Sequence, residues 1–142
     1  MSFTGNWACN VFKTGMMNGT YNFTSSTFYI ALYTNVATLD ATTTAYTSVG
    51  EVASSSAYTT TGLALTIAQV PTTGNTGTTA YVSFDNAVWT GSITARGALI
   101  YQSGGSNPAI CVLDFGNDKA SIITFTVQFP TATNTSAIIR IS

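Results

Sequence analysis

The chain has 142 residues, of which 45% are hydrophobic and only 6% are charged, with a formal net charge of -1. Its four basic residues are scattered, so the sequence predicts no nucleic-acid partner, and the absence of histidine excludes Ser-His-Asp triads and histidine-based metal sites. Threonine and serine, 27 and 14 in number, make up over a quarter of the chain, so we expect solubility to come from hydroxyl groups rather than from charge. Such a surface opposes association between molecules only weakly.

The sequence shows no targeting or membrane-spanning segment. The first residues, "MSFTGNWACNVFK", lack a charged region followed by a continuous apolar stretch, so we expect no signal peptide and synthesis in a cytoplasm. The longest apolar runs, such as "GLAL", are far shorter than the roughly 18 to 20 residues of a membrane span. We therefore expect no membrane partner.

An N-terminal arm with a short helix is predicted for residues 1–19. Apolar residues recur near the helical period between Val11 and Met17, with Asn10 as the candidate N-cap. Asn18 and the glycine after it mark the end of the helix.

From Thr27 onward the pattern is typical of β-strands. "TFYIALYT" alternates two apolar faces, which predicts a strand covered on both sides. The next segment, residues 35–58, is rich in hydroxyls and predicts a long loop, with an edge strand near 49–53.

The remaining segments predict a series of short antiparallel strands. "TGLALTIAQV" and "AYVSFDNAVW" form a predicted hairpin, followed by "ITARGALIY", by "NPAICVLDF" and "SIITFTVQF" joined through "GNDKA", and by "SAIIRIS". About seven or eight strands with turns between them predict an all-β fold, either an antiparallel β-sandwich or a small barrel, in a single domain covering residues 1–142.

Arg96 stands in the middle of the strand "ITARGALIY", where a charge needs a partner. If Gly91 turns the preceding strand back as a hairpin, Arg96 comes level with Asp85. We therefore expect a structural ion pair between Arg96 and Asp85, with a binding role for Arg96 as the alternative.

The acidic residues offer little catalytic chemistry. Asp114 and Asp118 flank a turn-like "FGN" and could form the carboxylate pair of a hydrolase, but two aspartates around a turn more often serve as a cap and a solvated charge. The "DFG" string at Asp114 lacks the other kinase motifs. We expect no catalytic residue, no metal and no cofactor.

The cysteines and aromatic residues predict packing rather than chemistry. Cys9 and Cys111 form neither a disulfide framework nor a CxxC pair, so we expect buried free thiols. Most aromatic residues fall in alternating strands and are expected in the core. Trp7 lies outside any clear strand and is the candidate exposed anchor.

Several motifs occur in a characteristic order between about residues 10 and 130: "GEVASSSAYTTTGLALT", "VSFDNAVWTGSITARGALIY", "VLDFGND" and "FTVQF". This succession resembles a family of small virion proteins of tailed bacteriophages. Members of the family often carry an acidic stretch before V-x-W, whereas only Asp85 remains at that place in this chain. The resemblance supplies no catalytic residue.

The resemblance implies a structural virion protein rather than an enzyme. The leading expectation is a cement or decoration protein on the outer capsid surface, bound to the major capsid protein and assembled as a homo-oligomer, either a trimer or a dimer. The alternative is a tail- or fibre-associated receptor-binding module that recognises a host-surface glycan through exposed aromatic residues such as Trp7 or Tyr46.

Overall fold

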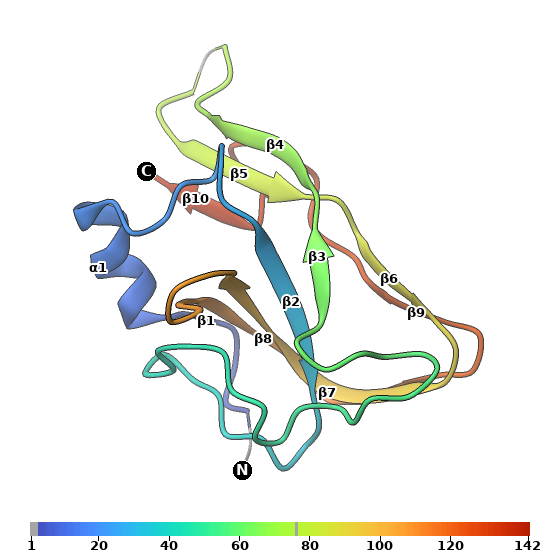
Figure 1. The fold of residues 1–142 in the computed structure, drawn as a ribbon. Coiled ribbons are helices and arrows are strands. Elements are labelled where there is room, and N and C mark those ends of the chain that lie inside the picture. Colours follow the sequence, from blue (N-terminus) through green and yellow to red (C-terminus); the bar gives the residue numbers. More distant parts are fainter. Residues whose placement is uncertain (1–2, 76) are drawn as a thin grey trace.

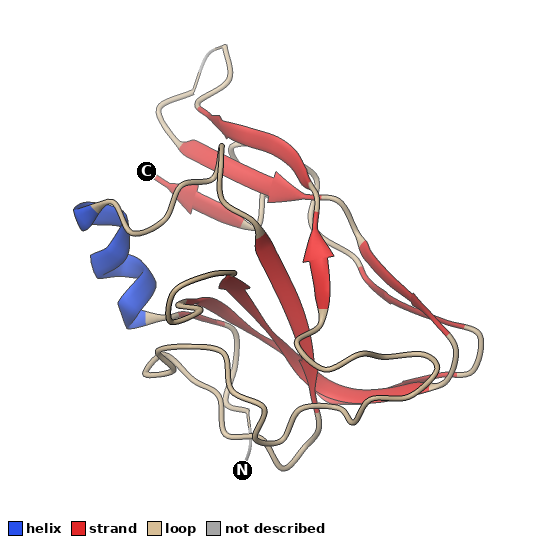
Figure 2. Ribbon diagram, in the orientation of Figure 1, coloured by secondary structure: helices blue, strands red, loops and turns tan. Residues whose placement is uncertain are grey.

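The chain is built mainly from β-strands, with one short helix in its N-terminal part (Figures 1 and 2). The computed structural model describes residues 3–75 and 77–142. Within these residues the strands form a five-stranded, a three-stranded and a two-stranded sheet, and all strand pairs are antiparallel. The predicted all-β class with a short helix is confirmed at this level.

The five-stranded sheet has the order β1-β8-β7-β2-β3. Its strands are β1 (Trp7–Ala8), β8 (Ala109–Ser121), β7 (Ile93–Gln102), β2 (Phe28–Tyr33) and β3 (Leu63–Leu65). Among the described residues, β1 and β3 remain its two edges, so the sheet does not close into a barrel.

Two smaller sheets complete the fold. The three-stranded sheet, in the order β10-β5-β4, consists of β10 (Ile139–Ile141), β5 (Ala80–Phe84) and β4 (Ile67–Thr72). The two-stranded sheet pairs β6 (Ala87–Thr90) with β9 (Thr124–Val127) beside the far ends of β7 and β8 (Figure 1).

Aromatic side chains join the sheets through a common core. Phe28 of β2 stacks on Phe23 with 4.7 Å between ring centroids, and Phe84 of β5 lies 5.9 Å from Phe28. Trp89 of β6 lies 6.2 Å from Phe125 of β9. All five rings are buried, so their removal from water stabilises the contact between sheets that share few backbone hydrogen bonds.

Helix α1 spans Asn10–Asn18, close to its predicted position. Its N-cap is Cys9 rather than Asn10, and Gly19 ends it in the left-handed conformation, as the sequence predicts. Phe12 turns into the core, where its ring meets Tyr21 edge-on at 5.1 Å. The helix therefore holds the N-terminal segment against the sheet.

Two of the predicted strands each divide between sheets. "TGLALTIAQV" breaks at Thr66 into β3, which pairs with β2, and β4, which pairs with β5. "AYVSFDNAVW" likewise becomes β5 and β6, which lie in different sheets. Alternation identifies a strand but not its partner, because the partner is set by contacts distant in sequence.

The turn predicted at "GNDKA" is instead part of β8. Asp114, before this segment, pairs with Gly97 of β7, and Lys119, within it, pairs with Ala95, while residues 115–118 bulge out of the ladder. Gly116 adopts φ 85, which favours glycine, inside this bulge. The real turn between β8 and β9 lies at Ile122 and the residue after it.

The long loop between β2 and β3 runs along the lower side of the sheet (Figures 1 and 2). The edge strand predicted near 49–53 is reduced to a single bridge between Tyr33 and Glu51. A second bridge joins Ala45 to Pro108. The loop is therefore attached at separate points rather than by a continuous ladder.

Candidate functional site

Arg96 pairs with a different carboxylate from the one expected. Its guanidinium forms a salt bridge to Asp114 on the neighbouring strand β8, and the Arg96 Cζ atom lies 5.4 Å from the centroid of the Phe3 ring. Both side chains of the pair are largely buried, 15% and 14% exposed. The Asp114 Oδ1 atom also accepts the Gly116 N–H at 2.8 Å, so the ion pair closes the β8 bulge.

The expected pair between Arg96 and Asp85 therefore needs correction. Gly91 does not fold β6 back onto β7, because β6 pairs with β9. Asp85 directly follows β5, and there its N–H donates to the Thr66 carbonyl oxygen at 2.9 Å and its side chain is exposed. Arg96 has an acidic partner, as predicted, but the predicted hairpin between β6 and β7 is wrong.

The two aspartates around "FGN" are both engaged by neighbouring groups. The hydrogen bond from Arg96 holds the pKa of Asp114 below its ordinary value. Asp118 is exposed and accepts a hydrogen bond from the Asn35 amide at 3.2 Å. In addition to its ion pair, Asp114 accepts the Gly116 N–H, which is the capping role expected for an aspartate at a turn.

A carboxylate among tyrosines anchors the long loop, and sequence reasoning did not predict it. Glu51 accepts hydrogen bonds from the Tyr46 hydroxyl at 2.5 Å, from the Tyr58 hydroxyl at 2.7 Å and from the Thr61 N–H at 2.8 Å. The Tyr58 oxygen in turn accepts the N–H of Leu32 in β2 at 2.9 Å. This Glu51 cluster links the loop to β2, next to the edge strand β3.

The phenols of the Glu51 cluster stay neutral near pH 7. Tyr101 lies beside the cluster and donates to the Thr61 carbonyl oxygen at 2.6 Å, and burial, followed by the nearby Glu51 charge, raises its pKa to about 12. Burial, followed by the hydrogen bond that each donates to Glu51, raises the pKa of Tyr46 and of Tyr58 well above the ordinary value. Neutral phenols donate hydrogen bonds to the carboxylate, so the arrangement suits structural support.

The spacing of the "GEVASSSAYTTTGLALT" motif was the signal that could have predicted the cluster. It places Glu51, Tyr58 and Gly62 within one segment, and these residues meet the backbone of β2. Gly62 adopts φ 87, and a Cβ atom there would lie 2.0 Å from the carbonyl oxygen of Ile30. The motif is therefore explained by packing of the loop.

The cysteines are free, and their environments differ. Cys9 is fully buried, whereas Cys111 is half-buried opposite Ala8 in the β1–β8 pair. Burial raises the pKa of the Cys9 thiol to about 11. Within residues 3–75 and 77–142, no group of three or more His, Cys, Asp or Glu side chains is placed to hold a metal ion.

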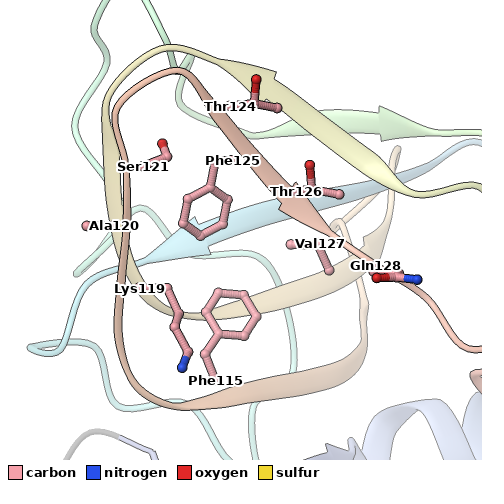
Figure 3. A pocket seen from close by; sticks show the side chains of 9 residues that line it. All are labelled: Phe115, Lys119, Ala120, Ser121, Thr124, Phe125, Thr126, Val127 and Gln128. Carbon is pink, nitrogen blue, oxygen red and sulfur yellow. The ribbon is translucent and has the colours of Figure 1, made fainter.

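A pocket of about 460 Å³ lies between β8 and β9. Phe115 and Phe125 point toward one another across it, with the Lys119 side chain beside Phe115 (Figure 3). Their ring centroids are 6.2 Å apart. The walls also carry hydroxyl groups, which include those of Ser121 and Thr124.

Two adjacent isoleucines project from the turn beside this pocket. Ile122 is 87% exposed and Ile123 is 75% exposed. The backbone of the turn is nevertheless fixed, because the Ile123 carbonyl oxygen accepts the Gly91 N–H at 2.7 Å and the Ser121 hydroxyl donates to the Gly91 carbonyl oxygen at 2.8 Å. We call these two residues the isoleucine tip.

The candidate anchor Trp7 lies in β1 and is 40% exposed. Its indole N–H donates to the Thr4 hydroxyl at 3.2 Å, and its ring borders a groove of about 570 Å³ between α1, β8 and β10. Tyr46, the other aromatic residue considered for glycan binding, is half-buried and hydrogen-bonded to Glu51.

Comparison with known proteins gives no relative to guide the assignment: no protein-family model, no curated protein and no solved structure matches the chain. In the described part of the chain, no helix has the length and apolar character needed to cross a membrane.

Proposed function

We propose that this chain is a structural protein of a tailed-bacteriophage virion, acting without catalysis as a cement or decoration protein on the outside of the capsid. The observation that carries the proposal is the isoleucine tip. Isolated apolar residues are common on protein surfaces, but two adjacent isoleucines on a turn with a fixed backbone present a preformed apolar contact. Binding to a partner protein would remove both side chains from water.

The residues behind the family resemblance support a structural role. Glu51 and Tyr58 of the first motif tie the long loop to β2, and Arg96 and Asp114 of the later motifs close the β8 bulge. Each of these polar groups is satisfied within the chain. They serve to hold a rigid scaffold on which surface contacts can be displayed.

The proposed mechanism is stabilisation of the assembled shell by mass action. A protein that binds only the assembled capsid adds binding free energy to that state, and many copies oppose rupture by the packaged DNA. The partner is the major capsid protein, and the bound form is a dimer or trimer at the capsid surface. With few charges, the chain must rely on apolar and hydroxyl contacts there.

We also infer that the sheets pack as a β-sandwich. The rings of Phe28 and Phe84 bring the five-stranded and three-stranded sheets together, and Trp89 and Phe125 extend the same core to the two-stranded sheet. A shared apolar core between sheet faces is the feature that defines this architecture.

The isoleucine tip provides the test of the proposal. An Ile122→Ser/Ile123→Ser variant should bind particles stripped of the protein at least about tenfold more weakly, because apolar anchors dominate such contacts. Binding is measured by co-sedimentation with the particles, and shell stability by release of DNA on heating.

The matched control is Val36→Ser/Val49→Ser, which changes two residues of the long loop with similar exposure, 73% and 75%. We expect this variant to bind as the unaltered protein does and to restore resistance to heat. Full binding by the isoleucine variant, or unchanged DNA release when the protein is absent, would reject the proposal.

A receptor-binding role at the tail is the second candidate, favoured by the exposure of Trp7 beside a groove. Aromatic faces of this kind can stack on sugar rings. The copy number per particle separates the two functions: hundreds of copies in a quantified gel support the capsid, and a few tens or fewer support the tail.

A further inference from the structure

The groove beside Trp7 forms a second apolar surface, separate from the isoleucine tip. It lies between α1, β1, β8 and β10, and its volume is about 570 Å³. Its walls include Trp7, Met17, Leu113, Ile139 and Ile141. Met17 is 84% exposed, so a large part of this apolar lining faces solvent. We call this surface the terminal groove.

One wall of the terminal groove is an edge strand. β10 pairs with β5 on one side, and among the described residues no strand pairs with its other side. That outer side lies toward α1 (Figure 1), and residues 138–141 line the groove. An edge strand offers unpaired N–H and C=O groups to an added strand, whereas side-chain pockets beside it select the residues of that strand.

The charges of the groove are all of one sign. Lys13 of α1 and Arg140 of β10 line it, and the described residues of its lining include no carboxylate. In the described part of the chain, the salt bridge between Arg96 and Asp114 is the only one, so neither cation of the groove is paired with an acid. Lys13 contacts the Asn10 side-chain oxygen at 3.4 Å, and Arg140 contacts the Thr135 carbonyl oxygen at 2.7 Å.

This charge pattern argues against a second copy as the occupant. In a two-fold symmetric contact the same surface meets itself, so the cations Lys13 and Arg140 of one copy would face the equally cationic groove of the other. Like charges brought together in a desolvated contact oppose binding. A segment with acidic side chains could instead form ion pairs with both Lys13 and Arg140.

We propose that the terminal groove binds an extended peptide segment of a partner protein, in which apolar and acidic residues alternate, by adding it as a strand to the open edge of β10. Alternation follows from strand geometry, because side chains of an added strand would lie in turn on the face of Ile139 and Ile141 and on the face of Arg140. The inference goes beyond the virion role and does not depend on it.

Trp7 provides the signal for a direct test with the full chain. The second tryptophan, Trp89, is only 6% exposed, so a ligand in the groove should change the emission of Trp7. The probes are blocked peptides of about six residues, roughly 20 Å when extended. One alternates valine with glutamate, a second alternates valine with lysine, and a third alternates serine with glutamate.

We expect saturable binding of the valine–glutamate peptide at concentrations below about 1 mM, and at least about tenfold weaker binding of the other two peptides. A Trp7→Phe variant should lose the fluorescence change and still bind the peptide in calorimetry. Absence of binding up to about 1 mM, or equal binding of the lysine peptide, would refute the inference.

Variants of the cations test the charge argument separately. Lys13→Gln/Arg140→Gln should weaken binding of the valine–glutamate peptide by about three- to tenfold, because each exposed ion pair contributes modestly. Lys119→Gln, which removes a cation outside the groove, should bind it unchanged. Sedimentation of the same variants tests whether the protein associates with itself through the groove. Such self-association would identify a second copy as the occupant and overturn the proposal.

Discussion

At the scale of single residues, Arg96 shows how a charge is accommodated in a strand of the core. Its guanidinium meets the Asp114 carboxylate on one side and the Phe3 ring on another. Gly97 makes room for this arrangement, since a Cβ atom there would lie 2.4 Å from the Phe3 ring. The "TARG" and "DFG" motifs therefore form one structural unit across β7 and β8.

Replacing Arg96 tests the energetic role of this unit. Arg96→Met leaves a largely buried carboxylate without its main partner, and we expect a loss of about 1 to 3 kcal/mol in the free energy of unfolding. Urea denaturation at pH 7 measures the loss. Arg140→Met, at an exposed cation without a carboxylate partner, should change stability far less.

The pH dependence of the Arg96→Met effect follows from the direction of the Asp114 shift. Because folding lowers the pKa of Asp114, the pair contributes fully above the pKa of an unfolded aspartate, about 4, and this contribution is lost as the pH falls through the lower folded value. The stability difference between the two proteins should shrink in acid. A difference that is constant from neutral pH to about pH 2 would contradict the ion-pair account.

At the scale of elements, the long loop between β2 and β3 depends on the Glu51 cluster for its position. Among the described residues, regular pairing of the loop is limited to isolated bridges, at Tyr33 of β2 and at Pro108, the residue before β8. Tyr58 supplies further attachment, because its hydroxyl donates to Glu51 and accepts the N–H of Leu32 in β2. A loop held in this way can be rigid without regular secondary structure.

Two tyrosine variants compare the anchoring positions. Tyr58→Phe removes a partner from both Glu51 and the buried Leu32 N–H, so we expect a loss of about 1 to 3 kcal/mol in the free energy of unfolding. Tyr46→Phe removes a single hydrogen bond at a half-buried site and should cost about 0.5 to 1.5 kcal/mol. Denaturant titration gives both values, and a larger loss for Tyr46→Phe would show that Tyr58 is not the main anchor.

At the scale of the whole molecule, buried tyrosines make the stability of the core sensitive to alkaline pH. Burial raises the pKa of Tyr21 and of Tyr101 to about 12. Each hydroxyl donates at 2.6 Å to a backbone carbonyl oxygen, that of Ala109 and that of Thr61 respectively. Ionisation of either phenol would remove the donated proton and place a charge in the core.

We therefore expect a cooperative loss of stability in alkali. Because folding raises these pKa values, their contribution is complete below the unfolded pKa of about 10 and is lost as the pH rises toward 12. Tyrosinate absorbance should rise together with the loss of β-structure in circular dichroism. Ionisation of all tyrosines near pH 10 with the fold intact would contradict the burial.

The sequence alone predicted most of the individual elements. The helix near residues 10–18, the strand at 28–33 and the strand core at 93–101 follow from local periodicity and turn residues. It also indicated that Arg96 needs a partner, because the cost of an unpaired charge in a strand is independent of the fold.

Only the tertiary structure decided how these elements combine. It separated β5 from β6, continued β8 through the "GND" bulge, gave Arg96 its partner Asp114 and assembled the Glu51 cluster. These outcomes depend on residues far apart in the chain, whose meeting is set by burial of a shared core. Local patterns record which face of a strand is apolar, and they do not record which other strand will cover it.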